Sequence, residues 1–169
     1  QQTESEYGAM MATTYQRFGL ADTHINAARN TGNYYRHLVG NLPDVLTIDD
    51  THRFITKAGC WQVRFDAGHS PGHMSLTDTA RKLHICVDFL LPRISPNISV
   101  KLRDLNDDML ADYLCYLDSM TDVPADWLII PGHDWPYFGG GVRARQLSAH
   151  HANRLDQLLK IIKNKPANT

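Results

Sequence analysis

The sequence has few cysteines, no run of like charges and no long apolar stretch, and each absence excludes a class of protein. The three cysteines are an odd number without short metal-type spacing, which argues against a disulfide framework and a cysteine zinc site. With 17 Lys+Arg against 18 Asp+Glu, there is no electrostatic footprint for nucleic acid or an anionic membrane. The longest apolar stretches, such as 127–130, cannot span a bilayer. We therefore expect a soluble protein in a reducing cytoplasm.

The chain has 169 residues, of which 43% are hydrophobic, and this length suits one compact domain over 1–169. Leu110, Tyr113, Leu114 and Leu117 recur at the spacing of an amphipathic helix. Similar reasoning, with capping and turn residues, predicts helices over 4–18, 22–39, 107–120 and 142–163. Short β-rich runs between turn residues predict mostly antiparallel strands at 45–48, 54–57, 60–65, 74–77 and 82–87, and a further strand at 127–130.

Polar side chains follow three of the expected strands at the point where each gives way to a loop. They are His69 in Gly-His-Ser-Pro-Gly-His, Asp88 after 82–87, and His133 in Pro-Gly-His after 127–130. Loops at strand ends display the working residues of a rigid scaffold, and the flanking glycines and prolines let the backbone turn sharply there. Imidazole and carboxylate together suit an ion such as zinc.

Together these segments resemble the second half of the metallo-β-lactamase superfamily. The resemblance rests on residues 67–73 (Ala-Gly-His-Ser-Pro-Gly-His), 87–97 (Val-Asp-Phe-Leu-Leu-Pro-Arg-Ile-Ser-Pro-Asn) and 131–133 (Pro-Gly-His). It implies that His69 binds one metal, that Asp88 bridges two metals and orients the nucleophile, and that His133 binds the second. It also implies an α+β fold, an αββα sandwich of which residues 1–169 are the C-terminal half.

The sequence departs from the family pattern in several places. The family's His-x-His-x-Asp-His motif is absent, and Asp49-Asp50-Thr51-His52 has the wrong spacing. Because the chain starts at Gln1 and not at Met, we expect that a preceding N-terminal half has been removed. Val87 stands where the family usually has Gly, and Phe89 where it often has His. Asp134 replaces the usual Gly after His133, where it either supports a ligand side chain or faces water.

The remaining histidines are assigned simpler roles. His24, His37 and His84 are expected to be surface or packing residues. His150 and His151 are adjacent and point in different directions on a helix, so they are not expected to chelate one ion. His73 follows His69 closely and either hydrogen-bonds to a ligand or substrate or has no part in the site. The aromatic residues after His133 wall a substrate pocket or simply pack; they are Trp135, Tyr137 and Phe138.

The resemblance implies a metal-dependent hydrolase for small-molecule substrates. Two divalent ions, zinc with manganese or iron as alternatives, would supply a bridging hydroxide that cleaves an ester-, thioester-, lactam- or phosphodiester-like bond. The chain alone is expected to be inactive, and to self-associate or keep the missing N-terminal half, because half a sandwich exposes sheet edges and an apolar face. One alternative is a non-catalytic scaffold or binding module from a degenerate hydrolase half. Another is a di-iron redox protein of the same fold.

Overall fold

A computed structural model describes residues 4–31, 38, 40, 43–99 and 106–164. The chain divides into two compact units, one formed by Gln1–Thr47 with Val100–Asp107 and the other by Ile48–Ser99 with Asp108–Thr169. Each unit is described by itself, and the single domain over 1–169 stays a prediction. Within the described ranges, no helix combines the length and apolar character that a membrane span requires.

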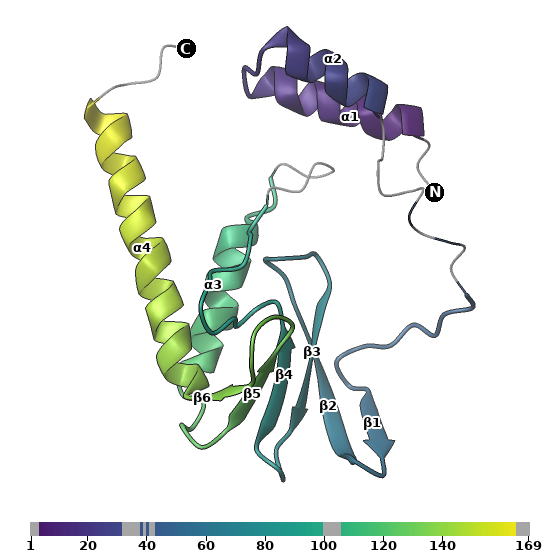
Figure 1. The fold of residues 1–169 in the computed structure, drawn as a ribbon, viewed down its shortest axis with the longest axis vertical. Helices are drawn as coiled ribbons and strands as arrows, with labels where there is room; N and C mark the ends of the chain where they lie inside the picture. Colours follow the sequence, from purple (N-terminus) through teal and green to yellow (C-terminus); the bar gives the residue numbers. More distant parts are fainter. Residues whose placement is uncertain (1–3, 32–37, 39, 41–42, 100–105, 165–169) are drawn as a thin grey trace. The chain divides into compact units, whose positions relative to one another are not determined.

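The first unit contains two helices, α1 (Glu4–Arg17) and α2 (Asp22–Thr31), joined by a short turn (Figure 1). They approach closely at Gly8, where a Cβ atom would lie 2.6 Å from the backbone oxygen of Arg29. The helix expected over 4–18 is confirmed. The helix expected over 22–39 is confirmed as far as Thr31, and most of its remainder lies outside the described residues.

The strand expected at 45–48 is wrong. These residues have no regular structure, and the side chains of Val45 and Leu46 are 72% and 81% exposed. β-rich residues favour a strand only where neighbouring strands and a packed face receive them, and among the described residues no strand pairs with this segment.

The second unit is built on a six-stranded sheet in the order β1-β2-β3-β4-β5-β6. The strands are β1 (Arg53–Thr56), β2 (Gly59–Asp66), β3 (His73–Asp78), β4 (Leu83–Val87), β5 (Leu128–Pro131) and β6 (Tyr137–Phe138). All neighbours are antiparallel except β4 and β5, which are parallel. The five strands expected between 54 and 130 are therefore confirmed. β6 was missed because it has only two residues.

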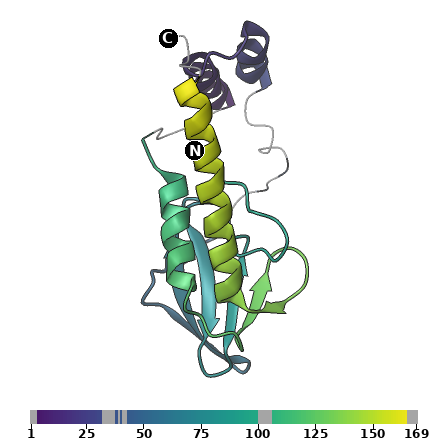
Figure 2. The same ribbon diagram turned by 90° about the vertical axis from the view of Figure 1, so that its left-hand side faces the viewer.

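Helices α3 (Met109–Met120) and α4 (Gly140–Asn164) lie side by side against the sheet (Figure 2). The Asp108 side chain caps α3 by accepting a hydrogen bond from the backbone N–H of Ala111 at 2.9 Å. α4 packs closely at its start, where a Cβ on Gly140 would lie 2.7 Å from the Ile129 side chain. Between helices and sheet lies one apolar core: Cys86, Phe89, Leu90, Tyr113, Tyr116, Leu117, Met120, Ile129, Ala144 and Leu147.

The two faces of the sheet differ in chemistry. On the face toward α3, His84 meets the Tyr116 hydroxyl at 3.3 Å, and the Arg64 guanidinium lies over the Tyr116 ring. The strand register places a different set together on the opposite face: Val63, Phe65, Met74, Leu76, Ile85 and Ile130. All of these except Val63 keep partial or full exposure. An apolar face of this kind is what a second sheet covers in a sandwich.

Candidate metal centre

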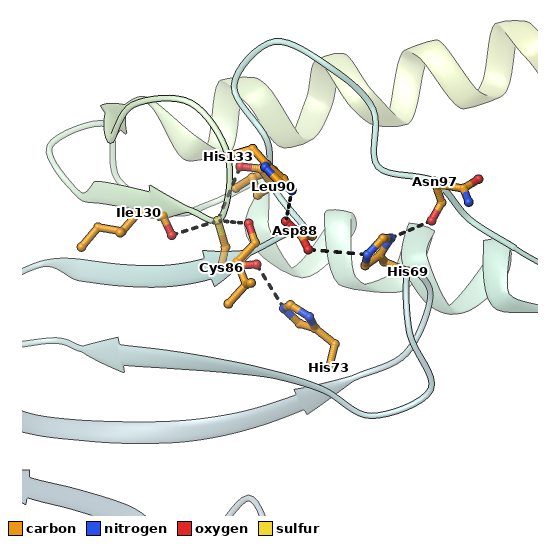
Figure 3. A network of polar contacts seen from close by, with 9 residues as sticks. His69, His73, Cys86, Asp88, Leu90, Asn97, Ile130 and His133 are labelled. Carbon is orange, nitrogen blue, oxygen red and sulfur yellow. Dashed lines mark hydrogen bonds and ion pairs between the residues drawn. The ribbon is translucent and has the colours of Figure 1, made fainter. Parts of the chain in front are cut away.

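Three turns carrying His69, Asp88 and His133 meet at one edge of the sheet (Figure 3). Asp88 follows β4 and His133 follows β5, and because these strands are parallel, both turns leave the sheet at its carboxyl edge. The loop that carries His69 leads into β3, which runs antiparallel to β4 and therefore begins at the same edge. The topology thus explains how residues far apart in sequence converge here.

The Asp88 carboxylate lies between the two imidazoles and presents a different oxygen to each. Oδ2 is 3.6 Å from Nε2 of His69, and Oδ1 is 3.3 Å from Nε2 of His133. A direct charge-assisted hydrogen bond would be about 2.7 to 2.9 Å long. Two donors that share a tetrahedral zinc ion, with bonds of about 2.05 Å, lie roughly 3.3 to 3.4 Å apart. Both separations are closer to the second value. Each pair of donors is therefore spaced as two ligands of one metal ion would be, with Asp88 common to both pairs.

The environment of Asp88 Oδ1 supports the same conclusion. This oxygen is buried and has no hydrogen-bond partner among the described residues. A buried carboxylate oxygen without a partner is costly, and a cation would satisfy it. The space beside it exists because residue 132 is glycine: a Cβ at that position would lie 2.6 Å from Oδ1.

The orientation of the His69 ring is fixed from behind. Its Nδ1 lies 2.8 Å from the backbone oxygen of Asn97. A carbonyl oxygen can only accept, so Nδ1 carries the proton and donates it, which leaves the lone pair of Nε2 directed toward Asp88. Metal-binding histidines usually have such a partner. Sequence reasoning did not find Asn97 because its backbone oxygen, and not its side chain, makes the contact.

The backbone before Asp88 is strained. Val87 has a φ of 43°, in the left-handed region that β-branched residues rarely adopt. The Val87 carbonyl accepts a hydrogen bond of 2.7 Å from the N–H of Gly132, which ties the Asp88 turn to the His133 turn. Val87 therefore adopts a conformation for which glycine, the usual family residue here, has no steric penalty.

The two supporting residues predicted from sequence, His73 and Asp134, have different surroundings. His73 is buried: its Nε2 donates to the backbone oxygen of Cys86 at 3.1 Å, and its ring stacks on Phe89 with centroids 3.7 Å apart. Burial lowers its pKa. The structure thus places His73 beneath the Asp88 turn, and its hydrogen bond goes to the backbone of β4. Asp134 is exposed, with a φ of 65°.

His24, His84, His150 and His151 lie on helices or strands and not in the three turns. His24 is exposed on α2. His84 is buried, with its Nδ1 2.9 Å from the Thr77 hydroxyl, and burial lowers its pKa to about 4. His150 and His151 lie on α4 with ring centroids 5.4 Å apart. The surface or packing roles expected for His24 and His84 are confirmed, and His37 lies outside the described residues.

In the part of the chain that the structure describes, no group of three His, Cys, Asp or Glu side chains is arranged to hold one ion. The donors form two pairs that share Asp88. A stable zinc site usually has three or four protein ligands. The described residues therefore supply about half of what two such ions require.

Two solved structures that are similar to this one have names from the metallo-β-lactamase family. A β-lactamase domain protein from Burkholderia ambifaria is 31% identical, with a TM-score of 0.70, and the match covers 91% of this chain and 45% of that chain. A metallo-β-lactamase family protein from Thermus thermophilus is 24% identical, with a TM-score of 0.73, and the match covers 90% of this chain and 48% of that one. Comparisons with protein-family profiles and with curated proteins found no match.

The predicted resemblance to the metallo-β-lactamase superfamily is confirmed, because the chain is similar to these two proteins in fold and to the Burkholderia protein also in sequence. The expected α+β class is confirmed, as is the correspondence to half of a metallo-β-lactamase domain. The chain spans about half the length of both solved structures.

Proposed function

We propose that this chain carries half of a dinuclear metal centre that belongs to a metal-dependent hydrolase. The observation that carries the proposal is the placement of Asp88, whose two oxygens face the Nε2 atoms of two different histidines. His69 and Asp88 would hold one ion, and Asp88 and His133 the other. Neutral imidazole and carboxylate favour zinc, with manganese or iron as alternatives.

Two such ions would generate a hydroxide near neutral pH and polarise the bond to be cleaved. The protein's own contribution is orientation. The Asn97 carbonyl fixes the His69 ring, the hydrogen bond between Gly132 and Val87 joins the two turns, and the buried Oδ1 atom of Asp88 has no hydrogen-bond partner among the described residues. Preorganised donors of this kind do not have to rearrange when an ion binds.

The substrate in this proposal is a small molecule with an ester-, thioester-, lactam- or phosphodiester-like bond. The superfamily uses similar metal chemistry for all of these, so the fold does not choose among them. Trp135 follows His133 closely and is 84% exposed. Its ring is a suitable wall for an apolar part of the substrate, since exposed aromatic side chains favour ligand contacts.

The donor count favours a second candidate function for the chain by itself. With two protein donors per ion among the described residues, the chain would hold metal weakly and be catalytically silent. It would then act as a scaffold or binding module. The metal content of a longer protein containing His-x-His-x-Asp-His distinguishes the two functions. The hydrolase would hold about two metals per chain, and the scaffold would hold none.

The test is zinc affinity, measured by competition with a chelating dye, for the chain and for His69→Ala and His133→Ala. His24→Ala is the matched control, because it removes an exposed imidazole from α2. We expect weak binding by the chain that is lost on dialysis, a further loss of about tenfold or more in either site variant, and no change in the control. Equal affinity in all four proteins would reject the proposed metal centre.

A further inference from the structure

A groove of about 420 Å³ lies on the second unit between α3, α4 and the segment that follows Ser95. Its lining is half apolar and half polar: Pro96, Asn97, Ile98, Leu110, His150, His151 and Arg154. None of these residues is acidic. The groove is therefore large enough for a small organic group and has the charge to attract an anion.

The positive charge of the groove comes from Arg154. Its guanidinium is always protonated, and none of the ion pairs found among the described residues involves it. His151 is held in place by a contact of 3.2 Å between its Nε2 and the Ser95 hydroxyl, and by edge packing on Tyr113. Burial is the main cause that lowers the pKa of His151, so this ring offers polar contacts and little charge near neutral pH.

The groove and the candidate metal centre share one residue. Asn97 lines the groove, and its backbone oxygen accepts the hydrogen bond from His69 (Figure 3). The segment that carries it is anchored to α4, because Arg143 donates to the backbone oxygens of Leu91 and Ile94 at 2.7 and 3.0 Å. Asn97 would thus separate a ligand in the groove from the imidazole of His69. The hydrogen bonds of Arg143 hold the segment that carries Asn97 in place.

We infer that this groove is a subsite for an anionic group of the substrate, a carboxylate or a phosphate, with Arg154 as its main contact and His150 and His151 as hydrogen-bonding partners. The inference rests on the proposed function, since it assigns part of the same substrate. The apolar residues of the lining, Pro96, Ile98 and Leu110, would contact the carbon atoms next to the anionic group. The substrate class is therefore narrowed to anionic compounds.

The test uses the chain freed of metal on a chelating resin, with inorganic phosphate and acetate as separate probes. Backbone amide shifts of residues 97–98 and 150–154 are followed by NMR during each titration. We expect saturable shifts with at least one probe. Arg154→Ala should weaken binding about tenfold, since it removes a charge-assisted hydrogen bond, and Arg154→Lys should restore part of it. Lys160→Ala, which removes the same charge from α4 outside the groove, should have no effect.

Each outcome decides the question. Saturation by phosphate alone assigns a phosphate group, and saturation by acetate alone assigns a carboxylate. No saturable shift with either probe, or equal weakening in Arg154→Ala and Lys160→Ala, overturns the subsite, because the second result would reflect the overall charge of the helix. Zinc affinity of the same samples keeps the two proposals apart. If His69→Ala lowers zinc affinity as expected but no anion binds, only the subsite is rejected. If an anion binds but His69→Ala leaves zinc affinity unchanged, only the metal centre is rejected.

Discussion

Gly132 is the position where a single methyl group should disturb the metal centre without disturbing the fold. A Cβ atom there would lie 2.6 Å from Asp88 Oδ1, whereas real Cβ contacts essentially never fall below 3.0 Å. The carboxylate oxygen must therefore move by at least about 0.4 Å, which is about twice the roughly 0.2 Å tolerance of metal–ligand distances. The atom at 2.6 Å is the end of a side chain, so its rotation costs about 0.5 to 1.5 kcal/mol. The Cγ1 and carbonyl carbon atoms of Val87, at 3.2 and 3.3 Å, must also give way by a few tenths of an ångström.

We expect Gly132→Ala to lower zinc affinity by about tenfold to a hundredfold and to leave the melting temperature within a few degrees of the parent chain. Gly72→Ala is the matched control. Gly72 belongs to the His69 loop, and a Cβ there meets nothing within 4 Å. Zinc affinity is measured by dye competition, and folding by circular dichroism during heating. If the two variants bind zinc equally, the proposed direction of the Asp88 carboxylate is wrong.

Other features of the structure carry three more predictions. The folded state holds the pKa of His84 at about 4, below its ordinary 6.5, so the unfolded chain binds the extra proton first; stability should be full above about pH 6.5 and fall by about 3 kcal/mol toward pH 4. Urea unfolding at several pH values measures the free energy of unfolding, and His84→Gln should flatten its dependence on pH between about 6.5 and about 4. An unchanged pH dependence in this variant would contradict the role given to His84. In a longer protein that contains His-x-His-x-Asp-His, Asp88→Ala should abolish hydrolysis of an identified substrate and His24→Ala should leave it unchanged, while equal rates would refute the role of Asp88. The chain should also self-associate, because Leu159 and Ile162 of α4 are each 51% exposed; light scattering should show mass rising with concentration and Leu159→Lys reducing it, and a monomer at every concentration would contradict the prediction.

Local patterns predicted most of the second unit. The amphipathic spacing from Leu110 to Leu117 placed α3 within two residues of its observed start, because a helix that packs along one side leaves its period in the sequence. The strand at 45–48 failed because strand formation depends on a neighbour that the local sequence does not contain. β6 consists of two residues, which is too short for any period to be visible.

The candidate site shows the same division. Glycine and proline next to His69 and His133 indicated sharp turns, and the structure brings both histidines to Asp88. The backbone contact of Asn97, the burial of Asp88 Oδ1 and the left-handed Val87 could not be predicted. All three arise when segments distant in sequence pack together, so no short window of sequence records them.

The parallel pairing of β4 and β5 also sets the order of events during folding. Antiparallel neighbours such as β3 and β4 meet through a short turn, but β5 reaches β4 only after the whole connection through α3 has closed. Non-local pairings of this kind form slowly. Asp88 and His133 flank that connection, so they come together at its closure and not before. An ion can bind the pair only after this closure, and a stabilising interaction that forms after the transition state slows unfolding and leaves the folding rate nearly unchanged. An ion held by this pair would therefore lengthen the lifetime of the native state without accelerating its formation.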